Sequence, residues 1–347
     1  MTGGTGFLGK SVVPLLTARG HTVWTLSRQN KTPSNDVHFI KGDLTLWDAG
    51  VDLTNDVRIQ KSFHTKDAIG PFDVCLHMAA LYDLQSGEER AMKNNVLGTQ
   101  TALTLAQKIE IPIFINISSV AVTINCSARQ VEPEDINLTS AFPDHYARTK
   151  ALAEKLVTDW EGPLRRLNLR LGVVVGDSVN GVIERIDGPY HCPHLFAKLK
   201  PWIERLPGAL PLPGREDRRL PLVPVNQAAA GIVRCLEIFH DEKTERNRSL
   251  HLIPKYGLPV PDLYSATLRH LAIHKKIKLL QNLPHILNRE LGSRVGRLPK
   301  EELSYLLRLP RLDESETRRW LGENWCSEFP DYETSFWRGY DQFVSNR

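Results

Sequence analysis

The stretch HYARTK, residues 145–150, opens an interval, residues 144–160, whose pattern predicts an α-helix. Tyr146 and Lys150 stand four positions apart, so a helix presents both on one face, about one turn from each other. An ammonium beside a phenol favours the phenolate and moves the tyrosine pKa from about 10 toward neutral pH. Tyr146 would then donate or accept a proton. The same spacing also occurs on solvated helices, so its meaning depends on the rest of the chain.

A glycine-rich segment lies at the amino terminus. Gly3, Gly6 and Gly9 form a Gly-x-x-Gly-x-x-Gly pattern, and an apolar helical pattern follows and ends at Arg19-Gly20. Glycines permit a tight turn and a close approach to a diphosphate, whose charge is met by amide N–H groups at the helix start. A strand pattern at residues 21–26 follows directly, which favours half of a dinucleotide-binding unit over a flexible terminus.

Only Met1 precedes this glycine segment, whereas a dinucleotide fold has a hydrophobic strand there, in the middle of its sheet. Loss of that strand would leave two sheet edges unpaired. We therefore expect either that the chain is incomplete at its amino terminus or that its start is misassigned.

Further strand patterns follow at residues 37–41, 72–80, 111–120 and 167–176, with helical patterns between them. They predict an α/β fold, a Rossmann-type doubly wound parallel sheet with a smaller, mostly helical C-terminal substrate region. Ser118 and Ser119 end one of these strands, and ligands bind at the carboxyl ends of open parallel sheets. No Gly-x-Ser-x-Gly elbow surrounds Ser119, which argues against serine nucleophile chemistry.

These motifs, in this order over about residues 2–255, resemble the extended (atypical) short-chain dehydrogenase/reductase family, which is NAD(P)-dependent and epimerase/dehydratase-like. The Pro-Leu-Pro-Gly segment at residues 211–214 looks like its fatty-acyl and thioester reductase branch. The resemblance implies that Tyr146 transfers a proton, that Lys150 tunes it, and that Ser119 holds the substrate oxygen. It also makes Asn95, in an Asn-Val-x-Gly-Thr element, a structural or proton-relay residue, with helix capping as the alternative.

The choice of cofactor depends on the end of the second strand. Arg28 suits a 2′-phosphate, where an acidic residue would suit a ribose hydroxyl, so we predict NADP, with NAD as the alternative. The resemblance assigns Asp43 and Leu44 to the adenine ring, whereas a simple strand-end aspartate is the competing account. His77 fits a packed structural histidine. The predicted cofactor-binding residues are Gly3, Thr5, Gly6, Phe7, Leu8, Gly9, Arg28, Asp43, Leu44, Ala79, Ala80, Tyr146 and Lys150.

The expected nucleotide domain comprises residues 1–177 and 222–255, and residues 178–221 and 256–347 form the expected substrate-binding region. Residues 177–220, rich in proline, aromatic and basic residues, indicate an irregular binding connection. The apolar spacing from Leu268 to Leu280 predicts a basic amphipathic helix that either packs on its own domain or rests on a membrane surface. The tail's aromatic residues predict that it is folded.

Composition limits the partners. The net charge of +4 argues against an obligate nucleic-acid binder, and no apolar run predicts a membrane span or a signal peptide. The five cysteines are scattered, which indicates thiols in a reducing compartment, no metal site and a cytoplasmic protein. We expect a small-molecule substrate that is lipid-like or an acyl thioester, and either a homodimer or a monomer.

The sequence therefore predicts an NADP(H)-dependent oxidoreductase that transfers a hydride to or from a carbonyl, alcohol or acyl-thioester substrate with a hydrophobic part. A redox-neutral nucleotide-sugar epimerase or dehydratase uses the same tyrosine and is one alternative. A non-catalytic NADP-binding sensor is the other, and the presence of Ser119, Tyr146 and Lys150 argues against it.

Overall fold

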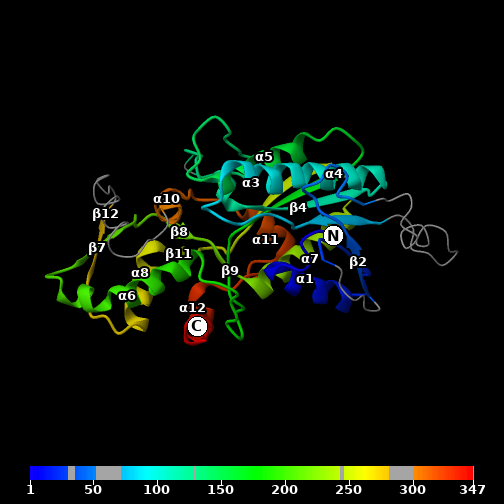
Figure 1. The fold of residues 1–347 in the computed structure, drawn as a ribbon. Coiled ribbons are helices and arrows are strands. Elements are labelled where there is room, and N and C mark those ends of the chain that lie inside the picture. The colour runs from blue at the N-terminus through cyan, green and yellow to red at the C-terminus, as the bar shows by residue number, and fades with distance from the viewer. Residues whose placement is uncertain (30–35, 52–71, 129, 243–245, 281–299, 347) are drawn as a thin grey trace. The chain divides into compact units, whose positions relative to one another are not determined.

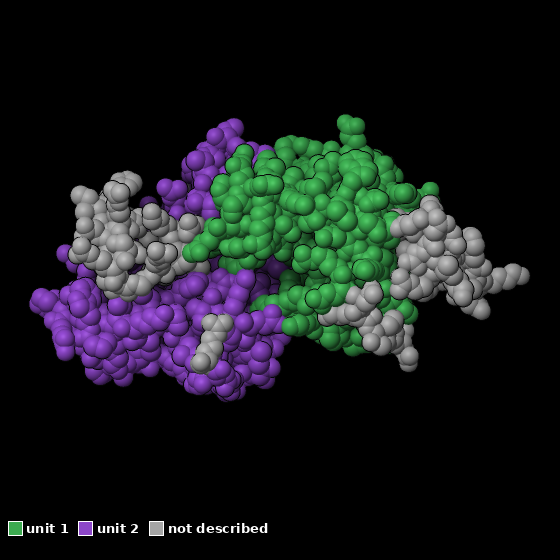
Figure 2. All heavy atoms as spheres, in the orientation of Figure 1, with its two compact units in different colours: residues 1–122, 145–170, 229–251 green, residues 123–144, 171–228, 252–347 purple. Residues whose placement is uncertain are grey.

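The computed structural model describes residues 1–29, 36–51, 72–128, 130–242, 246–280 and 300–346. The chain divides into two compact units, coloured separately in Figure 2. Unit 1 comprises Met1–Val122, His145–Arg170 and Ala229–His251, and unit 2 comprises Thr123–Asp144, Leu171–Ala228 and Leu252–Arg347. The boundaries of these units differ from those of the nucleotide domain and substrate-binding region expected from the sequence. Those expected regions were defined by function and stay a proposal.

Unit 1 is built on a parallel sheet. Its strands are β1 (Val23–Ser27), β2 (Val37–Lys41), β3 (Val74–His77), β4 (Ile113–Ser119), β5 (Arg165–Leu171) and β10 (Asn247–Leu252). β1 pairs with β2, and β3, β4, β5 and β10 follow one another in a four-stranded part. The residues of β4 and β5 are largely buried, as expected for strands covered on both faces. The strands predicted from residues 21–26, 37–41, 72–80 and 111–120 are confirmed, and β10 lies at the edge of the four-stranded part.

Thr2 joins the two parts of this sheet. Its N–H donates to the Leu76 carbonyl at 3.0 Å, its carbonyl accepts from the Met78 N–H at 3.2 Å, and the Leu26 N–H donates to the Met1 carbonyl at 2.9 Å. Thr2 thereby makes parallel bridges to β1 and to β3. Two residues thus occupy the central position that a dinucleotide fold gives to its first strand.

Helices cover both faces of the sheet. They are α1 (Phe7–Ala18), α3 (Glu88–Ala91), the π-helical segment η1 (Met92–Leu97), α4 (Gly98–Lys108), α5 (His145–Asp159) and α7 (Val225–Asp241). Figure 1 shows α3, α4 and α5 on one face and α1 and α7 on the other. α5 confirms the helix predicted for residues 144–160. Ala147, Ala151 and Val157 are fully buried on it, and Val157 joins the core formed with α4 and β4.

The strand predicted for residues 167–176 is wrong as a single element. It divides at Gly172 into β5 and β6 (Val173–Val175), and β6 pairs in parallel with β9 (Leu222–Pro224). A Cβ atom at Gly172 would lie 2.3 Å from the Pro221 carbonyl oxygen, so only glycine allows the two backbones to approach this closely. β5 ends at this glycine because the chain changes its pairing partner there.

The irregular connection predicted for residues 177–220 is also wrong. This part of unit 2 contains η3 (Gly188–Tyr190), α6 (His191–Arg205), β7 (Leu210–Pro213) and β8 (Arg219–Leu220). Cys192, Phe196 and Ile203 recur at helical spacing and are buried in the core of unit 2. The many prolines and basic residues concealed this amphipathic pattern.

The basic amphipathic helix predicted between Leu268 and Leu280 does not form. α8 (Val260–His270) ends there, Ala272 has a φ of 51°, and β12 (Ile277–Leu280) pairs in parallel with β7. The Ile273 N–H donates to the Leu268 carbonyl at 2.9 Å and the Ala272 N–H to the Arg269 carbonyl at 3.0 Å, which is a Schellman C-cap. A hydrophobic pair such as Leu268 and Ile273 accompanies that motif, so the apolar spacing marks a helix end and gives no membrane-surface helix.

The tail is folded, as predicted, in its described part. It contains α10 (Lys300–Arg308), α11 (Ser315–Leu321) and α12 (Phe329–Ser345), and a short strand β11 (Leu258–Pro259) pairs with β8. The ring of Phe336 stacks on that of Tyr190 at 4.2 Å between centroids, and Phe329 packs edge-on against Phe336. These aromatic side chains belong to the core of unit 2.

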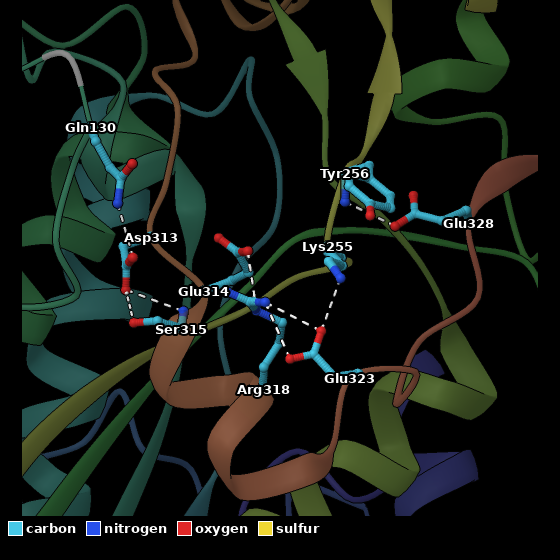
Figure 3. Close-up of polar contacts among 9 residues, drawn as sticks. All are labelled: Gln130, Lys255, Tyr256, Asp313, Glu314, Ser315, Arg318, Glu323 and Glu328. Atoms are coloured by element: carbon cyan, nitrogen blue, oxygen red, sulfur yellow. Dashed lines mark hydrogen bonds and ion pairs between the residues drawn. The ribbon is translucent and has the colours of Figure 1, made fainter.

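A polar cluster secures the connection between α11 and α12 (Figure 3). The two carboxylate oxygens of Glu328 accept hydrogen bonds from the backbone N–H groups of Tyr256 and Gly257, at 2.9 and 3.1 Å. Glu328 also forms a capping box with Asp331 at the start of α12. Nearby, Glu323 bonds Lys255 at 2.9 Å. Within unit 2, these contacts fix the turn after β10 to the tail.

Candidate active site

The first two turns of α5 carry Tyr146 and Lys150, and both residues are buried, with 9% and 4% exposure. The Lys150 Nζ donates a hydrogen bond to the Ile117 carbonyl oxygen of β4 at 2.7 Å. Burial lowers the pKa of Lys150 to about 8, although the carboxylate of Glu154 acts in the opposite direction. The ammonium is therefore held in a fixed position beside the end of β4.

The two serines at the end of β4 have different surroundings. Ser118 is 3% exposed, and its Oγ donates to the Oε2 of Glu154 at 2.5 Å. Ser119 is half-buried, and its Oγ accepts from the Ala121 N–H at 3.2 Å. That bond uses a lone pair of the Ser119 oxygen and leaves its hydroxyl proton available. Among the described residues, no acceptor for this proton is seen. Side chains alternate between the faces of a strand, so the two hydroxyls serve different sides of β4.

Asn95 lies inside η1 and is 1% exposed. Its Oδ1 accepts from the Leu81 N–H at 2.7 Å, and its Nδ2 donates to the Leu81 carbonyl at 3.3 Å and to the Thr149 Oγ1 at 2.9 Å. The helix-capping alternative is therefore wrong, because Asn95 is within the helix and bonds the loop after β3. A single turn of π-helix often marks a functional site.

Three residues near Tyr146 were not predicted from the sequence. Tyr82 follows Leu81, and its ring meets that of Tyr146 edge to face, at 4.9 Å between centroids and 83° between planes. Asn95 joins the backbone of Leu81 to Thr149, whose Oγ1 also donates to the Tyr146 carbonyl at 3.1 Å. Thr149 lies within the quoted stretch, but only the fold brings Asn95 to it.

The glycine turn has the geometry of a diphosphate cradle. A Cβ at Gly3, where φ is 73°, would lie 2.7 Å from the Ala79 nitrogen, and one at Gly9 would lie 2.4 Å from the Gly3 oxygen. At Gly6, which is exposed, a Cβ would meet only the Gly3 oxygen, at 3.4 Å. Gly6 is also the N-cap of α1 and provides no side-chain cap. With Thr5 before it and Phe7 and Leu8 in the first turn, this helix start offers N–H groups to an anion, so the residues fit a dinucleotide.

The remaining predicted cofactor residues lie at the ends of β1, β2 and β3. Arg28 is exposed directly after β1, and Leu44 is buried in the core of unit 1. The Asp43 Oδ1 accepts from the Thr45 N–H at 3.0 Å, which lowers the pKa of Asp43, and the charge of Arg28 adds to this. The Ala79 N–H donates to the Thr2 Oγ1 at 3.2 Å, and Ala80 is exposed.

His77 has the surroundings of the packed structural histidine that the sequence predicted. It is 1% exposed, with Nδ1 2.8 Å from the Thr2 Oγ1 and Nε2 3.1 Å from the Thr99 Oγ1. Thr99 donates its own proton to the Asn95 carbonyl at 2.6 Å, so Nε2 must carry the imidazole proton. Burial, with the nearby charge of Lys150, lowers the pKa of His77 to about 3, and the ring is neutral.

Within the described ranges, no three His, Cys, Asp or Glu side chains converge as metal ligands, and the five cysteines are free thiols. No helix among those ranges combines the length and the apolar character needed to cross a membrane.

Comparisons with known proteins agree with this geometry. Residues 26–229 match the sequence profile of the NAD-binding family described as "Male sterility protein". The 3-beta-hydroxysteroid dehydrogenase of Mycolicibacterium neoaurum is 28% identical over 171 residues, which are 47% of this chain and 43% of that protein. The 2-alkyl-3-oxoalkanoate reductase of Shewanella oneidensis is 24% identical over 249 residues, 69% of this chain and 57% of that protein. The chain thus spans about half the length of these relatives.

Among solved structures, the terminal R domain from the myxalamid PKS-NRPS biosynthetic pathway has a TM-score of 0.69 at 20% identity, and the match covers 99% of this chain and 90% of that domain. At this level of identity the likeness concerns the fold. The predicted Rossmann-type architecture is confirmed.

Proposed function

Since this chain belongs to the NAD-binding family described as male sterility protein, one of the extended short-chain dehydrogenases/reductases, we propose that it is an NADP(H)-dependent oxidoreductase. The proposed substrate is a carbonyl, alcohol or acyl-thioester compound with a hydrophobic part. One observation carries this proposal: Tyr146 and the anchored ammonium of Lys150 lie one turn apart on α5, and Ser119 ends the strand on which Lys150 is anchored. This is the residue set that hydride-transfer chemistry at a carbonyl requires.

Each side chain has a defined role in the proposed mechanism. When bound, the nicotinamide supplies or accepts the hydride. Tyr146 gives a proton to the substrate oxygen in reduction and takes it back in oxidation. Ser119 donates its hydroxyl proton to the same oxygen, since its bond from Ala121 occupies only a lone pair of its oxygen. Because an ammonium has three N–H donors and Ile117 accepts one, Lys150 retains two for the cofactor ribose and the phenol.

Arg28 makes the proposed cofactor NADP rather than NAD. It is exposed directly after β1, where an arginine can pair with a 2′-phosphate through two parallel hydrogen bonds. Replacing Arg28 by glutamine should weaken NADPH binding at least tenfold and leave NADH binding nearly unchanged. Fluorescence titration with both cofactors measures this. Equal weakening for both would argue against the assignment, and tighter binding of NADH than of NADPH by the wild-type chain would favour NAD.

The substrate class is proposed from the relatives. The two named above are a hydroxysteroid dehydrogenase and an oxoalkanoate reductase, and both names describe an alcohol or ketone on a hydrophobic skeleton. Such a skeleton fits a hydrophobic substrate better than a sugar.

The decisive experiment is a panel of ketones, alcohols and acyl thioesters assayed by NADPH absorbance. Tyr146→Phe should lower kcat at least about 100-fold with NADPH affinity retained, as expected for loss of general acid catalysis. Lys150→Met should also lower kcat, whereas Lys155→Met, an exposed lysine on the same helix, serves as the matched control. Conversion of a nucleotide sugar without net cofactor consumption would favour the epimerase. NADPH binding with turnover independent of Tyr146 would favour the sensor.

A further inference from the structure

A second group of ionisable side chains lies buried one helical turn beyond Lys150. Glu154 on α5 is 2% exposed, and Arg170 on β5 is 1% exposed. The Glu154 Oε1 accepts from the Arg170 Nε at 2.8 Å and lies 2.7 Å from the Arg170 Nη2. Its Oε2 accepts from the Ser118 Oγ at 2.5 Å. Both carboxylate oxygens are therefore occupied by strong donors.

The network continues to the edge of the sheet. The Arg170 Nη1 lies 3.2 Å from the Nε2 of His251, on β10, which is fully buried. A guanidinium has no acceptor atom, so Nε2 must accept and the imidazole proton must be on Nδ1. The Arg170 guanidinium therefore lies between the carboxylate of Glu154 and the acceptor nitrogen of His251. A buried ion pair is weak evidence for stability alone, because desolvation offsets most of its attraction.

The same helix connects this network to the catalytic lysine. Lys150 bonds the Ile117 carbonyl, and Glu154 bonds the side chain of the next residue, Ser118. α5 thus holds the end of β4 at two consecutive residues, directly before Ser119. Lys150 and Glu154 are four positions apart, which puts the carboxylate about one turn from the ammonium.

We infer that Glu154 is a positioning residue for the catalytic centre: it keeps the buried Lys150 in its ammonium form and fixes the end of β4 that carries Ser119. This inference rests on the proposed function. The favourable charge of Glu154 opposes the effect of burial on Lys150. Arg170 pairs with Glu154 and holds its carboxylate in place inside the protein.

Other groups around Lys150 do not replace this charge. His77 on β3 is neutral, as its two hydrogen bonds and its lowered pKa both require. Tyr146 is uncharged when it acts as a proton donor, and the end of β4 contributes only backbone and serine groups. Arg170 is positive and would disfavour the ammonium if its partner were removed. Glu154 is thus the acidic side chain that faces Lys150 among the described residues.

The test substitutes Glu154 by glutamine and follows Lys150 directly. NMR of ¹³C-labelled lysine side chains gives its titration midpoint, and the Lys150 signal is identified by its loss in Lys150→Arg. We expect the midpoint to fall by about one pH unit or more in Glu154→Gln. The alkaline limb of kcat/KM should move to lower pH by the same amount, because the ammonium form becomes scarcer at neutral pH. A purely structural role for Glu154 would lower activity or stability without moving either midpoint.

Two further variants complete the test. Asp159→Asn removes an exposed carboxylate from the same helix, where it pairs with Lys155, and should leave the Lys150 midpoint unchanged. If Glu154→Gln does not fold, Glu154→Gln/Arg170→Gln leaves no unpaired buried charge, and its midpoint should also lie below that of the wild type. A wild-type midpoint in whichever variant folds overturns the inference. A lowered Lys150 midpoint in the variant, together with no substrate turnover by the wild-type chain, would refute the proposed function. It would leave the electrostatic role of Glu154 supported.

Discussion

Replacing Gly9 by alanine should destabilise the fold of the glycine turn. Gly6→Ala should leave the fold intact and weaken only the binding of NADPH to this turn. At Gly9 the new methyl would lie 2.4 Å from the Gly3 oxygen and 2.6 Å from the Gly4 carbonyl carbon. Carbon atoms in contact normally stay about 3.5 to 4 Å apart, so the turn would have to shift by about 1 Å. Gly3 has little room to shift, because its backbone lies against Met78 and Ala79 at the end of β3.

The magnitude follows from two opposing terms. Overpacking of this kind costs roughly 1–3 kcal/mol, and alanine inside a helix gains about 0.5–1 kcal/mol over glycine. Gly9→Ala should therefore lower the free energy of unfolding by about 1–2 kcal/mol. Gly6 has a φ of −78° and open space around its Cβ position, so Gly6→Ala should be nearly neutral for folding.

Urea unfolding followed by circular dichroism measures the stability term, and NADPH fluorescence titration measures the binding term. Gly9→Ala should lower the urea midpoint and weaken NADPH binding. Gly6→Ala should keep the midpoint and weaken binding about tenfold, which is about 1.4 kcal/mol. A wild-type urea midpoint for Gly9→Ala would contradict the packing argument. Wild-type NADPH affinity for Gly6→Ala would mean that the diphosphate does not lie over this turn.

Three further variants test other parts of the chain. His77 has its pKa lowered from 6.5 to about 3, so the unfolded chain binds its proton more tightly. The free energy of unfolding should therefore fall between pH 6.5 and 3, by up to roughly 5 kcal/mol, and less steeply in His77→Gln, as urea titrations at several pH values would reveal. Glu328→Gln weakens the carboxylate bonds to Tyr256 and Gly257 and should cost about 1–3 kcal/mol, measured by the same method; an unchanged urea midpoint would refute that role. Thr149→Val removes the nearer of the two acceptors of the Asn95 amide and should lower kcat several-fold with NADPH affinity retained, whereas unchanged steady-state kinetics would mean that this bond does not position Tyr146.

Local patterns predicted the elements that depend on local physics. The helix that carries Tyr146, the glycine turn and the buried strands follow from periodicity and turn chemistry within a few residues. The same reasoning failed where two structures share one local pattern. Leu268 and Ile273 have the spacing of a helical face, but they form the hydrophobic pair of a Schellman cap around Ala272.

The polar surroundings of the site could not be predicted, because they join residues far apart in the chain. Glu154 on α5 meets Ser118 on β4 and Arg170 on β5, and Asn95 in η1 meets Leu81 in the loop after β3 and Thr149 on α5. Nothing in the neighbourhood of each residue indicates its partner. Glu154 had one local signal, its position four residues after Lys150, which puts an acidic group on the same helical face.

The paired serines explain why such distant contacts matter for the chemistry. Successive residues of a strand face opposite sides, so a slip of one residue in β4 would exchange the positions of Ser118 and Ser119. Ser118 bonds Glu154 in the interior, and Lys150 bonds the carbonyl of Ile117. These two bonds together are compatible with only one register of β4 against α5. In that register, Ser119 is the serine whose hydroxyl proton is unused. The buried acid therefore determines which serine is available to a substrate, even though it lies on the other side of the strand.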